Sequence, residues 1–368
     1  MAVSERAELR HEERNGRCER CARRRRGRRP RKIAVRRLAC LSLGLLMACE
    51  SPAGETPTRT SSPAASPVLE SPAASASPSS EPRPITLHGR VALSMDRGAN
   101  IDVYLLDLPS GRLRRLTNDP ADDLSPSWSP DGTRIAFRSD RDGNDEVYVM
   151  DADGTHERNL TRDAASDYSP AWSPDGASIA FASSRADPTG NDIWLMEADG
   201  SDPRPLVEQR GIDEYPVWSP DGARLAFGCT LGEILPSGVG DFEICVVQAD
   251  GSGLTRVTDA PGLTSVGAWS PDGTRIISSS SRDQDPGGVS QCGDLYLIAV
   301  DGSSTARLTS GPGHDCDPTF SPNARYIVFS SDRAQLGGDS DLFAMRADGS
   351  DITRLTRSGS EEQEAAFS

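Results

Sequence analysis

Acidic side chains collect at one recurring place in the sequence, in the few residues ahead of a Trp-Ser-Pro-Asp-Gly motif or its relatives. The set comprises Asp122, Asp123, Asp167, Asp213, Glu214, Asp315, Asp317, Glu361, Glu362 and Glu364. If the fold brings these segments to one rim, their carboxylates would attract a cationic ligand, a basic peptide segment or a divalent ion. The alternatives are a solvated surface on an acidic protein and carboxylate pairs for glycoside chemistry.

Four cysteines beyond residue 49 could form two disulfides, with three connectivities open. When the repeats are aligned, Cys229 ends one strand and Cys245 lies in the next strand of the same unit, so the two face each other across a hairpin. Cys292 and Cys316 fall in loops on one face of the following unit. We therefore favour Cys229–Cys245 and Cys292–Cys316, pairings that an exported protein permits.

Catalytic motifs are scarce. The sequence has no Gly-x-Ser-x-Gly elbow, no HExxH and no phosphate-binding loop. Three histidines follow residue 49, namely His88, His156 and His314, and the expected strand order places His156 and His314 on opposite faces. We expect no cofactor, no metal ligands and no catalytic residues. A divalent cation attracted by the acidic residues in or near the channel is the alternative. Residues 140–145 superficially resemble a calcium loop but lack its downstream glutamate.

The elements that would position these residues repeat along the chain. The motif occurs at Trp128, Trp172, Trp218 and Trp269, returns as Phe-Ser-Pro-Asn at Phe320 and starts again at Phe367. Each unit predicts a strand ending at the aromatic residue, a Pro-Asp-Gly turn, and three further strands. A period of 44 to 51 residues is typical of four-stranded propeller blades.

The number of blades follows from the two ends of this array. Residues 89–117 supply three strands without a preceding motif, and residues 361–368 supply a first strand with nothing after it. The two pieces complete one blade, which also removes exposed sheet edges. The sequence therefore predicts an all-β, six-bladed propeller over residues 85–368, closed by pairing of its N- and C-terminal strands.

These motifs resemble the repeats of the TolB β-propeller family over residues 85–368. The resemblance implies a partner protein at the channel mouth. The same repeat occurs in peptidase propellers and oligogalacturonate lyases, and TolB carries an additional α/β domain where this chain has a 35-residue linker. The chain is thus similar to TolB without matching its domain organisation.

The segment ahead of the repeats is expected to export and anchor the protein. Residues 1–49 combine a basic region with an apolar run at 38–48 and end in Cys49, in a context similar to a bacterial lipobox. Residues 50–84 are rich in Ser, Pro and Ala and predict a disordered tether. An ordinary signal peptide with a coincidental cysteine is the alternative. We expect lipidation at Cys49 and a location in the periplasm or on the cell surface.

The net charge excludes nucleic acid as a partner. Beyond residue 49 the chain has 25 basic and 50 acidic side chains, a net charge of −25, which would repel nucleic acid.

The repeats also predict a structural ion pair in each unit. An arginine follows the second strand and an acid precedes the third. The arginines are Arg97, Arg141, Arg185, Arg282 and Arg333, and the acids are Asp102, Glu146, Asp192, Asp294 and Asp341.

Together these features predict a monomeric, membrane-anchored binding propeller rather than an enzyme. An envelope protein or peptide would bind at the mouth through Asp122, Asp123, Asp167, Asp213, Glu214, Asp315 and Asp317. The alternative is a carbohydrate-active enzyme or ligand sensor that uses the same carboxylates.

Overall fold

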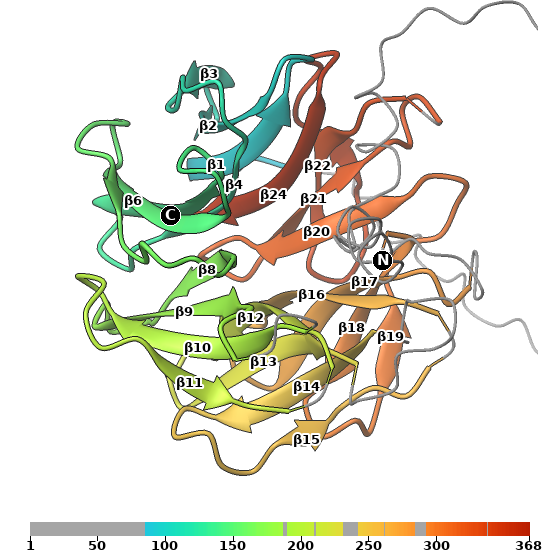
Figure 1. Cartoon of the computed structure of the whole chain (residues 1–368). Coiled ribbons are helices and arrows are strands. Elements are labelled where there is room, and N and C mark those ends of the chain that lie inside the picture. Colours follow the sequence, from blue (N-terminus) through green and yellow to red (C-terminus); the bar gives the residue numbers. More distant parts are fainter. Residues whose placement is uncertain are drawn as a thin grey trace, which may run out of the picture. The chain divides into compact units, whose positions relative to one another are not determined.

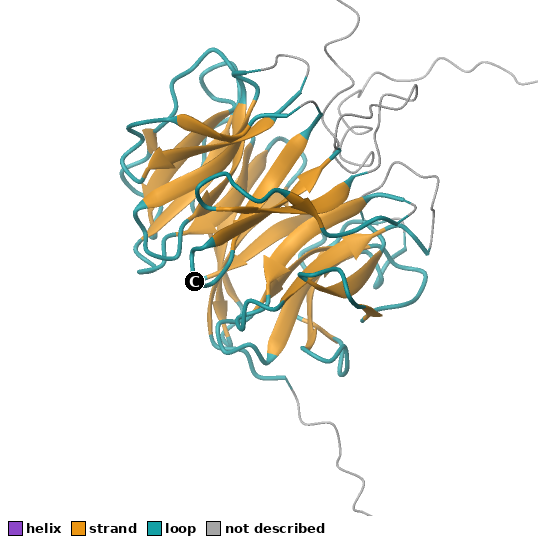
Figure 2. Cartoon of the chain, turned by 90° about the horizontal axis from the view of Figure 1, so that it is seen from below, coloured by secondary structure: helices purple, strands orange, loops and turns teal. Residues whose placement is uncertain are grey.

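The structure, a computed structural model, describes residues 85–186, 190–209, 211–230, 242–260, 262–283, 292–336 and 338–368. These residues form strands, turns and loops, and no helix is assigned among them (Figure 2). The expected signal peptide, Cys49 and the tether lie outside the described residues.

Twenty-four strands form six antiparallel sheets of four strands (Figure 1). Sheet 1 contains β24 (Glu361–Phe367), β1 (Gly89–Asp96), β2 (Ile101–Leu108) and β3 (Arg112–Arg115). Sheet 2 contains β4 (Asp123–Trp128), β5 (Arg134–Ser139), β6 (Glu146–Asp151) and β7 (Arg158–Asn159). Sheet 3 contains β8 (Asp167–Trp172), β9 (Ser178–Ser183), β10 (Asp192–Glu197) and β11 (Arg204–Val207).

The remaining three sheets repeat this order. Sheet 4 contains β12 (Asp213–Trp218), β13 (Arg224–Cys229), β14 (Glu243–Gln248) and β15 (Thr255–Arg256). Sheet 5 contains β16 (Thr264–Trp269), β17 (Arg275–Ser280), β18 (Asp294–Ala299) and β19 (Thr305–Arg307). Sheet 6 contains β20 (Asp315–Phe320), β21 (Tyr326–Ser331), β22 (Asp341–Arg346) and β23 (Thr353–Arg354).

One strand of each sheet belongs to an inner ring. β4, β8, β12, β16, β20 and β24 each contact the next strand of this set, and β24 contacts β4, so the ring closes. The loops that precede these inner strands leave one face of the propeller, which we call the mouth. The predicted six-bladed propeller is therefore confirmed.

Pairing of the chain ends closes the ring, as predicted. β24 runs antiparallel to β1, with Phe367 opposite Val91 and Glu362 opposite Met95, and the two strands lie side by side in Figure 1. The indole nitrogen of Trp128 in the neighbouring sheet donates to the Ala366 carbonyl at 3.1 Å. The C-terminal strand is thereby bound to sheet 1 and, through one side chain, to sheet 2.

Apolar side chains pack between neighbouring sheets rather than in one central core. One cluster joins Val103 and Leu105 of sheet 1 to Trp128, Ile135 and Phe137 of sheet 2. Phe137 and its counterparts at the same place in sheets 3, 4 and 6 are fully buried. Side chains of each second strand point alternately to its two faces, and the apolar ones form the surface on which the next sheet packs.

The Ser-Pro-Asp-Gly segments form the turns that the sequence predicted, on the face opposite the mouth. Ser129 N donates to the Arg134 carbonyl at 3.0 Å, and Gly132 adopts a φ of 67°, a conformation that glycine accepts readily. Asp131 accepts hydrogen bonds from Ser129 and Thr133, which lower the pKa of its carboxyl to about 2. The aspartate of the motif thus stabilises the turn through hydrogen bonds.

Candidate functional site

The acidic residues ahead of the motif lie at the mouth ends of the inner strands, but most of them are buried. Asp123, Asp167, Asp213 and Asp315 open β4, β8, β12 and β20, and each has no exposed surface. Asp122 and Glu214 are nearly as buried, and Asp317 is half-buried. Most of the carboxylates expected to bind a partner therefore have little surface at the mouth, and their role in binding stays a prediction.

Arginine side chains neutralise several of these carboxylates. In sheet 2, Arg141 Nη2 lies 3.1 Å from Asp123 Oδ1, while Arg141 Nε donates to Ser139 Oγ at 2.9 Å. The guanidinium carbon also lies 4.6 Å from the centre of the Tyr148 ring, within cation–π range. We call this arrangement, an arginine held between the first residue of the inner strand and an aromatic ring of the third strand, the arginine clasp.

The clasp recurs in three other sheets. It joins Arg185 to Asp167 and Trp194, Arg282 to Thr264 and Tyr296, and Arg333 to Asp315 and Phe343. In sheet 1, Arg97 stacks on Tyr104 but donates to Met95 Sδ at 3.3 Å, and Glu362 is bound instead by Thr356 and the Leu342 amide. Sheet 4 has no clasp among its described residues.

These contacts correct the ion pair expected from the sequence. In sheets 2, 3, 5 and 6, the arginine after the second strand contacts the first residue of the inner strand rather than the acid before the third strand. That acid pairs with an arginine of the outermost strand instead, in Arg115–Asp102, Arg256–Glu243, Arg307–Asp294 and Arg354–Asp341. Antiparallel pairing brings the inner strand beside the end of the second strand, whereas Asp102 and its counterparts face the fourth strand.

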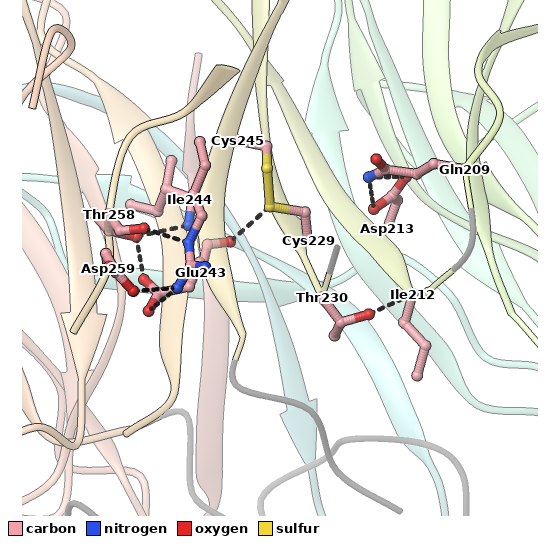
Figure 3. The surroundings of a disulfide bond; sticks show 11 residues. Gln209, Ile212, Asp213, Cys229, Thr230, Glu243, Ile244, Cys245, Thr258 and Asp259 are labelled. Carbon is pink, nitrogen blue, oxygen red and sulfur yellow. Dashed lines mark hydrogen bonds and ion pairs between the residues drawn. A yellow bond between two sulfur atoms is a disulfide. The ribbon is translucent and has the colours of Figure 1, made fainter. Parts of the chain in front are cut away.

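Asp213 is the exception among the buried aspartates. Its two carboxylate oxygens accept from Gln209 Nε2 at 2.8 and 3.0 Å, a neutral donor in place of the arginine (Figure 3). Burial, together with the nearby Asp192 and Glu214 carboxylates, raises the pKa of Asp213 to about 8. Burial also raises the pKa of the clasped Asp167, but only to about 6 because Ser183 and Arg185 oppose it.

Glu214 belongs to a hydrogen-bonded group shared by sheets 3 and 4. Its Oε1 accepts from Tyr168 Oη at 2.7 Å and from Asn191 Nδ2 at 3.0 Å. Burial raises the pKa of the Glu214 carboxyl, while these two donors lower it in part. The pKa of Tyr168 is raised well above its usual value, first by burial and then by Glu214. The pair therefore favours a neutral phenol donating to the carboxylate.

Two other carboxylates lie on neighbouring inner strands without an arginine. Glu364 of β24 accepts from Ser94 Oγ at 2.8 Å and from both the amide and the hydroxyl of Ser125, at 2.7 and 3.0 Å. Its own amide donates to Asp317 Oδ2 at 3.1 Å. Both acids are half-buried, and neither forms an ion pair among the described residues. Burial and the Glu364 charge raise the pKa of Asp317 to about 6.

The backbone of the inner strands directs these side chains. Ser125, Ser169, Tyr215, Asp317 and Glu364 occupy equivalent places and adopt φ values of 50° to 56°, a left-handed conformation uncommon for such residues. Register shifts interrupt the pairing of inner and second strands at this level. These five inner strands thus bulge at the same level, and in β24 the bulge directs Glu364 toward Ser125 of the next inner strand.

Sequence reasoning missed one cation in this region. Arg138 Nε pairs with Asp145 Oδ1 at 2.5 Å. Burial lowers the pKa of Arg138, but Asp145 and Glu364 more than compensate and raise it overall. A signal was present, because the equivalent positions in the other sheets hold small residues: Ser94, Ala182, Gly228, Ser279 and Ser330.

The structure joins Cys229 to Cys245 and Cys292 to Cys316. Cys229 and Cys245 are fully buried within sheet 4, whereas the second bond connects sheet 6 to the segment leading into β18. Both are among the pairings favoured from the sequence. The role of the rim carboxylates in binding stays a prediction.

Other expected features can be placed only in the part of the chain that the structure describes. There, no three His, Cys, Asp or Glu residues come together as metal ligands. In the 140–145 segment, Asp142 accepts from Tyr148 and Asn159, and Asp145 holds Arg138. Across the same residues, no helix is long and apolar enough to cross a membrane.

A cavity of about 580 Å³ lies on the face opposite the mouth, between sheets 4 and 5. Its lining includes Arg224 and Arg275 beside Asp301. Arg224 stacks on Trp269 at 4.8 Å and donates to the Gly273 carbonyl at 3.1 Å. None of the predicted binding carboxylates lines this cavity.

Two protein families match parts of the chain. The TolB beta propeller domain family matches residues 238–368, and the Tricorn protease N-terminal beta propeller domain family matches residues 98–191. An uncharacterised protein of Agrobacterium fabrum (strain C58) is 36% identical over 90 residues. That alignment covers 24% of this chain and 27% of the relative, about a quarter of the relative's length.

Solved structures show the same fold at low sequence identity. TolB from Acinetobacter baumannii superposes with a TM-score of 0.63 at 23% identity, over 76% of this chain and 66% of that one. A protein assigned as TolB in Agrobacterium tumefaciens gives 0.58 at 24% identity, over 73% and 89%. Hydrazine synthase from Kuenenia stuttgartiensis gives 0.61 at 15% identity, over 76% and 46%.

Proposed function

We propose that this chain, which is a TolB-like β-propeller, is an extracytoplasmic binding protein that holds a basic segment of an envelope protein or peptide at its mouth. The family resemblance, a fold often used for protein binding, and the expected export signal support this proposal. Lipidation at Cys49 would attach the protein to the membrane, with residues 50–84 as the tether.

The observation that carries the proposal is the contrast between two groups of carboxylates. Asp123, Asp167 and Asp315 are buried and already paired with arginine, so a partner gains little by approaching them. Asp317 and Glu364 are half-buried and receive only serine and backbone donors. These two can accept a charge-assisted hydrogen bond from an incoming lysine or arginine.

The same contrast disfavours the enzyme alternative. Acid–base chemistry on a sugar needs carboxylates that reach the substrate. The clasped aspartates have no exposed surface, and their charges stabilise arginines of the scaffold. The enzyme alternative therefore loses most of the carboxylates on which it relied.

The test compares two charge-matched variants of the full chain in a pull-down from envelope extract. Asp317→Asn with Glu364→Gln removes two negative charges from the inner strands while keeping the size of both side chains. The control, Glu208→Gln with Asp259→Asn, removes two charges from exposed loops on the same face.

We expect a protein that is retained by the parent and by the control variant and is lost with the inner-strand variant. Retention by all three would contradict the assignment to Asp317 and Glu364. Loss from both variants would indicate general electrostatic attraction and would contradict a localised site. If the parent retains nothing, the protein-binding proposal itself fails.

A further inference from the structure

Sheet 4 keeps the aspartate of the arginine clasp, Asp213, and replaces its other three parts. The serine that ends the second strand in sheets 2, 3, 5 and 6 is Cys229 here, and the aromatic ring of the third strand is Cys245. The arginine two residues after that serine corresponds to Leu231. The chain has therefore exchanged an ionic and aromatic contact for a covalent bond.

The bond occupies the place of the clasp. Cys229 lies opposite Asp213 of the inner strand and opposite Glu243 of the third strand, at the mouth end of the sheet. Its sulfur is bonded to Cys245, which belongs to the same buried apolar cluster (Figure 3). The disulfide thus ties β13 to β14 where Arg141 ties the equivalent strands of sheet 2.

The second disulfide does not take the place of a clasp. Cys292–Cys316 lies beside Gly293 and Asp315, whose backbones already exchange hydrogen bonds of 3.3 and 2.7 Å. The adjoining sheets also keep the clasp arginines Arg282 and Arg333. Without its disulfide this region retains other links, whereas sheet 4 would retain two buried thiols beside an aspartate that Gln209 binds.

We propose that oxidation of Cys229 and Cys245 is a maturation step that completes sheet 4, carried out by a disulfide-bearing oxidant of the extracytoplasmic compartment. The two thiols lose two electrons and two protons as the S–S bond forms, and the oxidant's disulfide is reduced to two thiols. Before this step, backbone pairing joins β13 to β14, but this end of sheet 4 has no side-chain link equivalent to the clasp among its described residues.

The first experiment follows the full chain from its reduced state, with oxidised glutathione as the oxidant. Mass mapping reports which bond has formed, and hydrogen exchange reports the protection of β13 and β14. We expect their amides to exchange on the order of a hundredfold faster before Cys229–Cys245 forms. Formation of Cys292–Cys316 alone should leave β13 and β14 unprotected. Full protection of sheet 4 in the reduced chain would overturn the proposal.

Variants separate this role from the general effect of a disulfide. Cys229→Ser with Cys245→Ser should lower the melting temperature more than Cys292→Ser with Cys316→Ser. A triple variant restores the serine, the arginine and the aromatic residue of a clasp through Cys229→Ser, Leu231→Arg and Cys245→Tyr. This triple variant should regain protection of β13 and β14 and become insensitive to reductant at those strands. Equal losses from the two serine pairs would contradict the proposal, whatever the triple variant does.

Discussion

Two aspartates at equivalent positions differ in what neutralises them. Asp123 faces Arg141, whereas Asp213 faces the amide of Gln209. Burial favours the protonated form of a carboxyl group, and the nearby Asp192 and Glu214 carboxylates add to this effect at Asp213, whose pKa reaches about 8. Burial also raises the pKa of Asp123, but a hydrogen bond from Ser139 and the charge of Arg141 oppose that shift.

The raised pKa of Asp213 predicts that the protein loses stability as the pH rises from about 4 to about 8. A group whose pKa is higher in the folded state stabilises the protein fully below its unfolded pKa, about 4, and loses that contribution as the pH rises toward about 8. Asp213→Asn should therefore flatten the fall in melting temperature between pH 5 and 8.5. Thermal unfolding at a series of pH values measures this, and an unchanged pH profile would contradict the assignment.

Asp123→Asn is the matched comparison. Because this change leaves the buried guanidinium of Arg141 with less charge compensation, we expect a loss of about 1–3 kcal/mol across the same pH range. A variant as stable as the parent would show that the clasp contributes little.

Three of the inner strands are bound to the preceding inner strand by the tryptophan that ends them. The indole nitrogens of Trp128, Trp218 and Trp269 each donate to a carbonyl of the preceding inner strand at 3.1 Å. Trp172 Nε1 is buried and has no such partner. Arg90 and Arg134 stack on Trp128 and Trp172 at nearly equal distances, 4.5 and 4.6 Å, so the two sites differ mainly in this hydrogen bond.

This contrast predicts that replacing tryptophan by phenylalanine lowers the free energy of unfolding by different amounts at the two sites. Trp128→Phe removes a bond that holds the C-terminal strand, and Trp172→Phe removes a buried donor that is unpaired. We expect Trp128→Phe to lose about 1 kcal/mol more than Trp172→Phe, because losing an unsatisfied polar group is nearly neutral. Chemical denaturation of both variants measures the difference. Equal losses would mean that the hydrogen bond to Ala366 adds no net stability.

At the scale of the whole molecule, net charge favours basic partners. Residues after 49 carry 25 arginines and 50 acids, and the clasps neutralise only part of this excess. Long-range attraction of this kind accelerates encounter and is screened by salt. Localised contacts at Asp317 and Glu364 would add affinity that depends on their ionisation.

Binding of a synthetic ten-residue lysine peptide should therefore weaken as salt rises from 50 to 500 mM. It should also weaken below about pH 6, where Asp317 becomes protonated. Fluorescence anisotropy measures both dependences, with the Asp317→Asn/Glu364→Gln variant in parallel. Persistence of the pH dependence in that variant would show that another group titrates.

The six-bladed architecture could be predicted from the sequence alone, because each repeat of the motif corresponds to one sheet. The spacing of Trp128, Trp172, Trp218 and Trp269, with incomplete units at both ends, requires six sheets and a closing strand. Period-two alternation in the second strands and Pro-Asp-Gly turns are local properties, so they could be predicted without tertiary contacts. The hairpin position of Cys229 and Cys245 followed in the same way.

Only the tertiary structure decided which charges meet. Arg141 is five residues from Glu146 and 18 from Asp123, and sequence distance favoured the wrong acid. Pairing of β4 with β5 places Asp123 opposite Ser139, beside the arginine, and at the same time removes that carboxylate from water. The burial of a carboxylate and the choice of its partner depend on strands that are distant in sequence. For this reason, most of the acids expected at the mouth are buried and bind residues of the propeller itself.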